Sequence, residues 1–303
     1  MGYNHISFPG IGIEPFRMDK TVFSLFGIDV AWYGLLITCG MLLAVLYALW
    51  IGKKIEGIKN DDILDLAIFI VLFGVMGARL FYVIFEWDQY VVTSGSFFSN
   101  IADTFLNIIN LRSGGLAIFG GIIGGLVTAF FVAKYKKIPV LKFFDILAPC
   151  VLIGQIIGRW GNFVNIEVYG AETESFLRMG LHSVNEAGEI VRETFVHPLF
   201  LYESVWNLVG LVLIHCLFLR KKFDGQLCST YFIWYGFGRM ILEGMRDPQY
   251  NLMLGGIRVS QLVGFSILAC GVVLMTVLVV RRKKKAAAEE KPPEDDGKST
   301  LFE

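Results

Sequence analysis

The chain has 303 residues, of which 55% are hydrophobic, and its mean hydropathy is +0.60. This composition excludes an ordinary soluble domain and indicates a membrane protein. Lys and Arg together number 27 and so do Asp and Glu, which makes the formal net charge zero. The distribution of the charges is therefore more informative than their sum, and no nucleic-acid partner is expected.

Seven long apolar segments follow one another along the chain. Each is close to the roughly 20 residues that a helix needs to cross about 30 Å of hydrocarbon. The segments predict an all-α membrane protein with seven transmembrane helices. The expected spans are 28–51, 63–85, 114–133, 143–161, 199–219, 226–245 and 257–280.

Basic residues cluster on alternate connections between these spans. They gather in four groups, at 53–59, 134–142, 220–222 and 281–285, whereas the other connections are diluted by acidic residues. Because positive charge stays on the cytoplasmic side, we expect the N-terminus outside and the C-terminus in the cytoplasm.

Three pieces of the chain are not expected to span the membrane. Residues 97–110 place apolar side chains near one face of a helix, which predicts a short helix in the outer interface. Residues 162–198 predict a small extracytoplasmic cap with a hairpin around Ala187 and Gly188. Charge and Pro292-Pro293 predict that 286–303 is a disordered cytoplasmic tail after a membrane domain of residues 1–285.

Charged residues lie within or at the edges of the apolar spans, at a common outer depth. Such residues are costly in a bilayer unless paired or wetted, and they usually mark a functional site. A rise of about 1.5 Å per residue places them at one level from separate segments. They are Arg79, Arg159, Glu203, Arg239, Glu243 and Arg246.

One face of the sixth span carries Arg239, Glu243 and Arg246 at positions i, i+4 and i+7, with Tyr235 one turn earlier. Two guanidiniums on this face can hold a phosphate while the carboxylate orients one of them. The alternative is an ion-pair ladder that only joins helices.

The stretch 158–167 places Arg159, Asn162, Asn165 and Glu167 where a helix gives way to the cap, which favours a ligand site. Glu203 is expected to pair with Arg159 or with Arg79, and Arg79 to neutralise Glu203 or Glu243. For the paired glycines of 120–125, helix packing is the favoured role.

The sequence contains no cysteine or histidine spacing typical of a metal site and no nucleotide-binding fingerprint. No cofactor and no metal are expected.

The stretch GRWGNFVNIEVYG at 158–170 resembles the most distinctive motif of the bacterial prolipoprotein diacylglyceryl transferase family. Further matches occur in family order over nearly the whole chain except the tail. They are Trp32-Tyr33-Gly34, Gly77-Ala78-Arg79, Gly114-Gly115, Gly120-Gly121, His197-Pro198, Leu201-Tyr202-Glu203, Tyr235-Gly236, Arg239, Glu243, Arg246 and Pro248.

The resemblance implies an enzyme of the bacterial cell (inner) membrane, with its site toward the outer leaflet. Such an enzyme moves the diacylglyceryl group of phosphatidylglycerol to the lipobox cysteine of a prolipoprotein signal peptide. It implies that Arg239 and Arg246 supply positive charge for catalysis, with Glu243 positioning them. Tyr235 is a further catalytic candidate, because it lies one helical turn from Arg239. The residues implied in substrate binding are Arg159, Asn162, Asn165, Glu167, Tyr33, Gly120, Gly121 and Glu203.

The chain departs from the family at Phe119, where many members have histidine and some tyrosine. Phenylalanine cannot accept a proton, so the general base must be another group, or the positive field must produce the thiolate. Tyr235, His197 and Glu243 are the candidates, in that order. The alternative function is a lipid or solute transporter with an anionic site in the outer leaflet; transporters of this kind are often built from internal repeats, and the sequence shows no such repeat.

Overall fold

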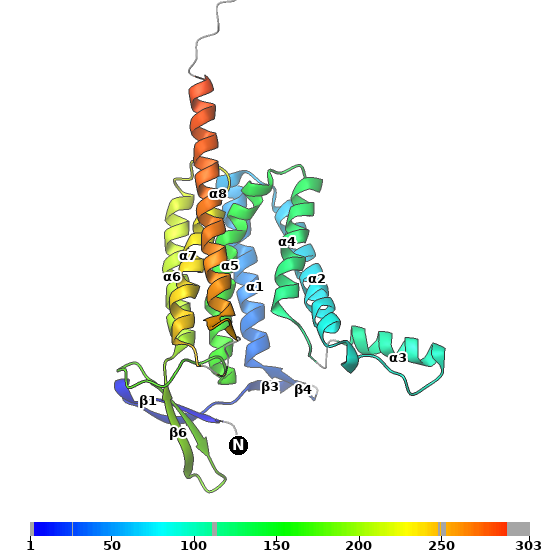
Figure 1. Ribbon diagram of the computed structural model, residues 1–303, viewed down its shortest axis with the longest axis vertical. Coiled ribbons are helices and arrows are strands. Elements are labelled where there is room, and N and C mark those ends of the chain that lie inside the picture. Colours follow the sequence, from blue (N-terminus) through cyan, green and yellow to red (C-terminus); the bar gives the residue numbers. More distant parts are fainter. Residues whose placement is uncertain (1–2, 26, 111–113, 248, 250–252, 290–303) are drawn as a thin grey trace, which may run out of the picture.

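A computed structural model describes residues 3–25, 27–110, 114–247, 249 and 253–289. Helices of a side-by-side bundle account for most of the chain, and β-strands lie at one end of it (Figure 1). The bundle helices are α1 (Trp32–Ile51), α2 (Asn60–Phe85), α4 (Ile118–Tyr135), α5 (Val140–Asn165), α6 (Leu199–Phe218), α7 (Gln226–Leu242) and α8 (Val259–Glu289).

Six of these helices, in the described part of the chain, are long and apolar enough to cross a membrane. All the bundle helices except α7 are in this set; α1 continues there into the π-helical turn Gly52–Glu56. Each rises about 1.5 Å per residue, so the shortest, α4 with 18 residues, is about 27 Å long. The seventh bundle helix, α7, has 17 residues.

The strands form a cap at the end of the bundle that also holds the beginning of the chain (Figure 1). A four-stranded antiparallel sheet has the order β2-β1-β5-β6. Its strands are β1 (His5–Phe8), β2 (Ile13–Arg17), β5 (Met179–Val184) and β6 (Ile190–Val196). The hairpin expected around Ala187 and Gly188 is present, but the N-terminal strands that complete its sheet were not foreseen.

Two small hairpins alter the expected ends of the spans. Strands β3 (Thr21–Leu25) and β4 (Ile28–Ala31) precede α1, so the span predicted from residue 28 begins as a strand. Strands β7 (Met253–Leu254) and β8 (Ile257–Arg258) likewise precede α8. Hydropathy did not separate these strands from the helices because both are apolar.

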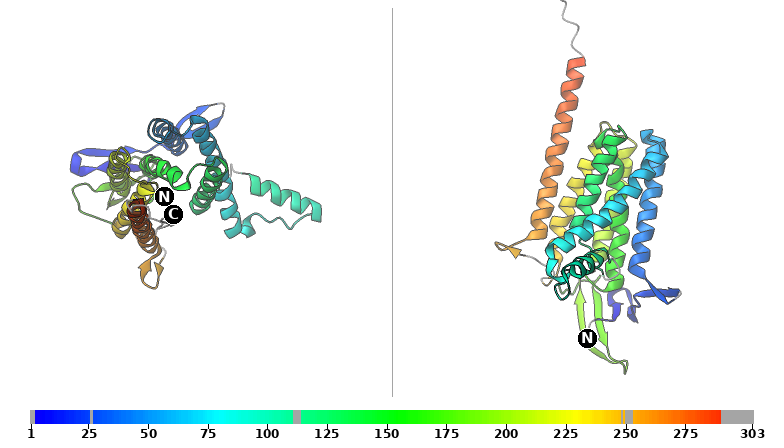
Figure 2. Two further views of the ribbon diagram at one scale, coloured as in Figure 1. Left: turned by 90° about the horizontal axis from the view of Figure 1, so that it is seen from above. Right: turned by 90° about the vertical axis from the view of Figure 1, so that its right-hand side faces the viewer.

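The helix expected at 97–110 is present as α3 (Phe97–Ile109), and it projects sideways from the bundle at the cap end (Figures 1 and 2). Ser96 caps its N-terminus by accepting a hydrogen bond from the Ser99 amide at 3.4 Å. The apolar side chains Phe97, Phe98 and Phe105 are 60% to 82% exposed. An apolar face left open beside a membrane-crossing bundle is typical of an interfacial helix.

At the end of the bundle opposite the cap, the prediction of a disordered tail at 286–303 is partly wrong. The last helix α8 runs through the polybasic residues and on to Glu289, so 286–289 are helical. The rest of the expected tail, 290–303, lies outside the described residues. Alanines at 286–288 favour helix, which explains why α8 continues past its apolar part.

Small residues let α2 and α4 approach closely. A Cβ atom added at Gly120 would overlap the carbonyl oxygen of Gly77, and one added at Gly124 would overlap that of Phe73. This is the helix packing expected for the glycine pairs.

Candidate functional site

An ion-pair chain joins three helices at the cap end of the bundle. Arg159 of α5 forms an ion pair with Glu203 of α6, and Glu203 also faces Arg239 of α7 at 3.6 Å. Arg239 continues the chain to Glu243 at 2.7 Å, and Glu243 reaches Arg246 at 2.9 Å. The structure thus brings together five of the six charged residues that the sequence singled out.

The carboxylates of this cluster are more deeply buried than the arginine side chains. The side chains of Glu203 and Glu243 are 6% and 1% exposed, whereas those of Arg159, Arg239 and Arg246 are 21%, 16% and 12% exposed. The arginine side chains are therefore more accessible than the carboxylates that they contact. Three cations against two anions leave one positive charge in excess, which suits a bound anion.

Arg246 reaches the cluster by a different backbone from the one expected. Helix α7 ends at Leu242, and residues Glu243–Met245 form a 3₁₀ turn, after which Arg246 is extended. The predicted span to 245 is therefore three residues too long, since Gly244 disfavours a continued α-helix. The contact between Glu243 and Arg246 is made across this turn instead of along one helical face.

A second polar group extends the cluster on the α5 side. Arg159 donates a hydrogen bond to the Asn162 side chain at 3.3 Å, and Asn162 donates to Glu167 at 3.0 Å. Asn165 also donates to Glu167, at 3.3 Å. Two amides thus hold the Glu167 carboxylate beside the guanidinium chain. Tyr33 of α1 completes this side, packed on Gly161 and within electrostatic reach of Glu167 and Arg159.

The backbone that carries Glu167 is strained. Its neighbours Ile166 and Val168 have φ of 54° and 57°, a left-handed conformation that β-branched residues rarely adopt. The Glu167 amide donates to the Asn162 carbonyl at 3.0 Å, which helps to hold this shape. Such strain persists where the surroundings fix it and is often found at functional sites. No local pattern in the sequence indicates this strain.

The cap is tied directly to the cationic end of the cluster. Gly170 forms a β-bridge with Arg246, and the Ala171 amide donates to the Met245 carbonyl at 2.8 Å. A Cβ atom at Gly170 would lie 2.9 Å from that same carbonyl oxygen, so only glycine fits there. Arg258, which sequence reasoning missed, donates to the Glu243 carbonyl from the end of β8.

Arg79 does not join the cluster, contrary to the expectation that it neutralises Glu203 or Glu243. Its guanidinium, in a residue that is 5% exposed, donates to the Tyr90 hydroxyl at 2.9 Å and to backbone carbonyls. These carbonyls belong to Asn107, Ile108, Asn110, Gly114 and Gly115, at 2.6 to 3.0 Å. Arg79 therefore fixes the end of α3 against α2.

The remaining predicted residues lie around the cluster. Tyr235 is stacked on Tyr231, with ring centroids 5.6 Å apart, and interacts electrostatically with Arg239 one turn later. His197 faces the Tyr202 hydroxyl at 3.5 Å, and burial lowers the pKa of His197. Gly120 packs on α2 as described above, Gly121 faces Ala78 and Gly74 of α2, and Pro248 lies outside the described residues. Phe119, on α4, is 58% exposed.

Chemically, the site offers a set of fixed cationic donors next to a less charged wall of amides. Such donors bind a phosphate and stabilise charge that builds on it during a reaction. In the described part of the chain, no group of three or more His, Cys, Asp and Glu side chains is placed to hold a metal ion.

Comparison with known proteins matches the sequence to one family. Residues 20–277 match the family model described as prolipoprotein diacylglyceryl transferase. The chain is 42% identical over 258 residues to the phosphatidylglycerol–prolipoprotein diacylglyceryl transferase of Finegoldia magna, covering 85% of this chain and 94% of that protein. It is 40% identical to the protein of that name from Clostridioides difficile (81% and 90% covered), and 38% identical to one from Bacillus cereus (86% and 92% covered). The chain belongs to the prolipoprotein diacylglyceryl transferase family.

Proposed function

We propose that the chain transfers the diacylglyceryl group of phosphatidylglycerol to the lipobox cysteine of a prolipoprotein, as the first step of lipoprotein maturation. The thiolate sulfur attacks the glycerol carbon that bears the phosphate. A carbon–sulfur bond forms, the carbon–oxygen bond to the phosphate breaks, and glycerol phosphate leaves. The thiol proton passes to a base or to water.

The observation that carries this proposal is the burial order of the ion-pair chain. A phosphodiester brings one negative charge, and the ion-pair chain of three arginines and two glutamates has one positive charge in excess. When the carbon–oxygen bond breaks, the phosphate gains a second negative charge. Donors that are already fixed stabilise this charge more than water does. Arg159, Arg239 and Arg246 supply them, while Glu203 and Glu243 hold the guanidiniums in place.

The residues beside the cations form the mouth of the site in this proposal. Asn162, Asn165 and Glu167 are linked to one another and to Arg159, and Tyr33 lies next to them. These groups suit the hydroxyls of the glycerol head group because amides and a carboxylate offer both donors and acceptors.

Tyr235 is the group we propose to assist loss of the thiol proton. It lies one helical turn before Arg239 and interacts electrostatically with that guanidinium, and Phe119 has no proton-accepting atom. His197 is less suited, because its hydrogen-bond partner is Tyr202 on the cap side.

In the membrane, we propose seven spans with α7 as the sixth, the cap and α3 outside, and the C-terminus in the cytoplasm of a bacterial cell. The basic connections support this orientation. The cap and the described end of α8 also lie at opposite ends of the bundle, as an odd number of spans requires (Figure 1). The site then opens at the level of the outer leaflet.

The test is incubation of the purified protein with phosphatidylglycerol and a peptide that contains a lipobox cysteine. Mass spectrometry should find the thioether-linked lipid on the peptide, and Arg159→Ala should abolish most of it. Arg178→Ala is the matched control, since Arg178 contacts cap carbonyls and lies outside the cluster. A folded protein that transports lipid but leaves the peptide unmodified would contradict the proposal.

A further inference from the structure

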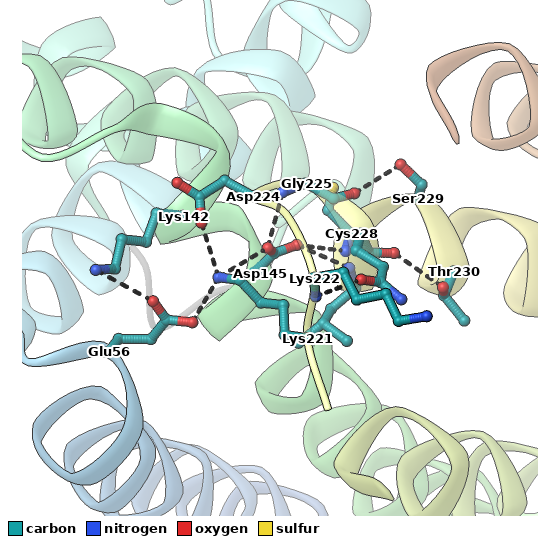
Figure 3. A network of polar contacts seen from close by, with 12 residues as sticks. Glu56, Lys142, Asp145, Lys221, Lys222, Asp224, Gly225, Cys228, Ser229 and Thr230 are labelled. Atoms are coloured by element: carbon teal, nitrogen blue, oxygen red, sulfur yellow. Dashed lines mark hydrogen bonds and ion pairs between the residues drawn. The ribbon is translucent and has the colours of Figure 1, made fainter. Parts of the chain in front are cut away.

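A second buried network of charges (Figure 3) surrounds the loop before α7, whereas Arg239 lies near the other end of that helix. Lys221, in the connection between α6 and α7, contacts Glu56 at 2.5 Å, Asp145 at 3.2 Å and Asp224 at 3.0 Å. Lys142 of α5 also contacts Glu56, at 3.2 Å. Asp145 is fully buried, and the Lys221 side chain is 11% exposed.

Asp145 holds the beginning of α7 as a cap supplied by another helix. Its two carboxylate oxygens accept hydrogen bonds from the backbone amides of Gly225, Leu227 and Cys228, at 2.8 to 2.9 Å (Figure 3). The first amides of a helix have no partner within it, and a carboxylate there also compensates the helix dipole. Gly225, with φ of 87°, allows the chain to turn sharply into α7.

Lys221 completes this attachment. Burial by itself lowers the pKa of Lys221, but hydrogen bonds to Glu56 and Asp224 and the charges of Asp145 and Glu56 outweigh it, so the pKa is raised. The amine therefore stays charged and links the turn after α1, the start of α5 and the loop before α7.

Further along, α7 is held by contacts of a different kind. Trp206 of α6 and Trp234 of α7 stack with ring centroids 4.4 Å apart, and each indole donates to the other's carbonyl, at 3.3 and 3.1 Å. The Gln155 side chain of α5 donates to the Tyr231 hydroxyl at 2.9 Å. Arg239 then meets Glu203 and Glu243 at the far end.

We propose that Asp145 and Lys221 are positioning residues that anchor α7 to α5, and so set where Arg239 and Glu243 stand relative to Arg159. Arg239 is 13 residues beyond the start of α7, or about 20 Å along it. A tilt of about 5° at the anchored end would displace Arg239 by about 1.7 Å over that length. Arg239 and Glu243 would move together, but such a shift is enough to break the 3.6 Å contact between Arg239 and Glu203 of α6 and to separate the guanidinium of Arg239 from that of Arg159.

The experiment compares Asp145→Asn and Lys221→Gln with Asp65→Asn. Asparagine keeps the shape of Asp145 but offers one acceptor oxygen in place of two, and glutamine removes the charge of Lys221 without touching the helix cap. Asp65→Asn is the matched control, because Asp65 forms a 2.5 Å ion pair with Lys136 beside α2 and α4, away from α7.

We expect the KM for phosphatidylglycerol to rise at least threefold in both α7-anchor variants and to stay within threefold of the wild type in the control. A loss of folded protein would lower the apparent kcat and leave KM unchanged. The inference is overturned if KM stays within threefold in either anchor variant, or rises equally in Asp65→Asn.

This inference rests on the proposed function, so a second readout keeps the two apart. Hydrogen–deuterium exchange of the protein in nanodiscs should show faster exchange over 226–246 in Asp145→Asn, and not in Asp65→Asn. If the wild type forms no thioether, the proposed function fails, and the exchange over 226–246 alone decides whether Asp145 anchors α7. Unchanged exchange in that segment would refute the anchor.

Discussion

Replacing Arg239 by lysine tests whether the geometry of the cluster matters beyond its charge. The Arg239 guanidinium contacts Glu243 at 2.7 Å and faces Glu203 at 3.6 Å, so it bridges carboxylates of two helices. A lysine amine is a compact charge and does not reproduce this planar fork. The variant keeps the charge sum and loses one of the two contacts.

The structure sets the expected size of the effect. A hydrogen bond to a charged group contributes about 1.5 to 3 kcal/mol. If the lost contact is needed when charge builds on the phosphate, the rate of thioether formation should fall roughly 10- to 100-fold. The assay measures kcat/KM with phosphatidylglycerol and a lipobox peptide in detergent micelles, at a lipid concentration below KM.

Arg178→Lys is the control for this substitution, because Arg178 makes its contacts to cap carbonyls. It should retain the wild-type rate within twofold. If Arg239→Lys also stays within twofold while the protein remains folded, the bridging geometry plays no part in turnover. The cluster would then act only through its total charge.

Three other changes test separate parts of the molecule. Tyr235→Phe removes only the hydroxyl near Arg239, and thioether formation at neutral pH should slow at least tenfold. Gly120→Val forces a side chain against the Gly77 carbonyl, and the free energy of unfolding should fall by about 1 to 3 kcal/mol in thermal unfolding. Burial lowers the pKa of His182 despite the Glu193 carboxylate, so the folded cap binds a proton at His182 less readily than the unfolded chain does. Acidification below about pH 6.5 should therefore lower the free energy of unfolding, by at most about 1.4 kcal/mol per pH unit.

Each of these predictions has its own control. Tyr231→Phe is the control for Tyr235→Phe, because it removes a neighbouring hydroxyl that contacts Gln155 and keeps the ring stack. Full activity in Tyr235→Phe would show that the Tyr235 hydroxyl takes no part in proton transfer. Gly125→Ala is the control for Gly120→Val and should be tolerated, because the nearest atom to a Cβ added at Gly125 is 3.7 Å away. Equal unfolding midpoints in the two variants would contradict the packing role of Gly120. His182→Gln is the control for the effect of pH. If its unfolding midpoint has the same pH dependence as that of the wild type, His182 is not the group responsible.

The pattern of charges in apolar segments was sufficient to predict the members of the ion-pair chain. The position of each residue along its span predicted one common level for Arg159, Glu203, Arg239, Glu243 and Arg246. The ion-pair chain confirms that these residues meet. Depth does not give direction around a helix, however. Arg79 lies at the same level, but it faces α3 and donates to backbone carbonyls instead of pairing with a carboxylate.

Other features depend on contacts between distant segments and left no local signal. The strand His5–Phe8 is defined by pairing with Met179–Val184, more than 170 residues later. The left-handed backbone at Ile166 and Val168 contradicts the preference of β-branched residues, so local propensity points away from it. Asp145 has no local motif around it in the sequence, and its part in holding α7 emerged only from the amides that it contacts.

The most direct test of the central claim is a cryo-electron microscopy structure of the protein with phosphatidylglycerol bound in a nanodisc. The phosphate should lie within hydrogen-bond distance of at least two of the guanidiniums of Arg159, Arg239 and Arg246, on the side away from Glu203 and Glu243. A phosphate held elsewhere, with these guanidiniums still closed on their carboxylates, would contradict the account.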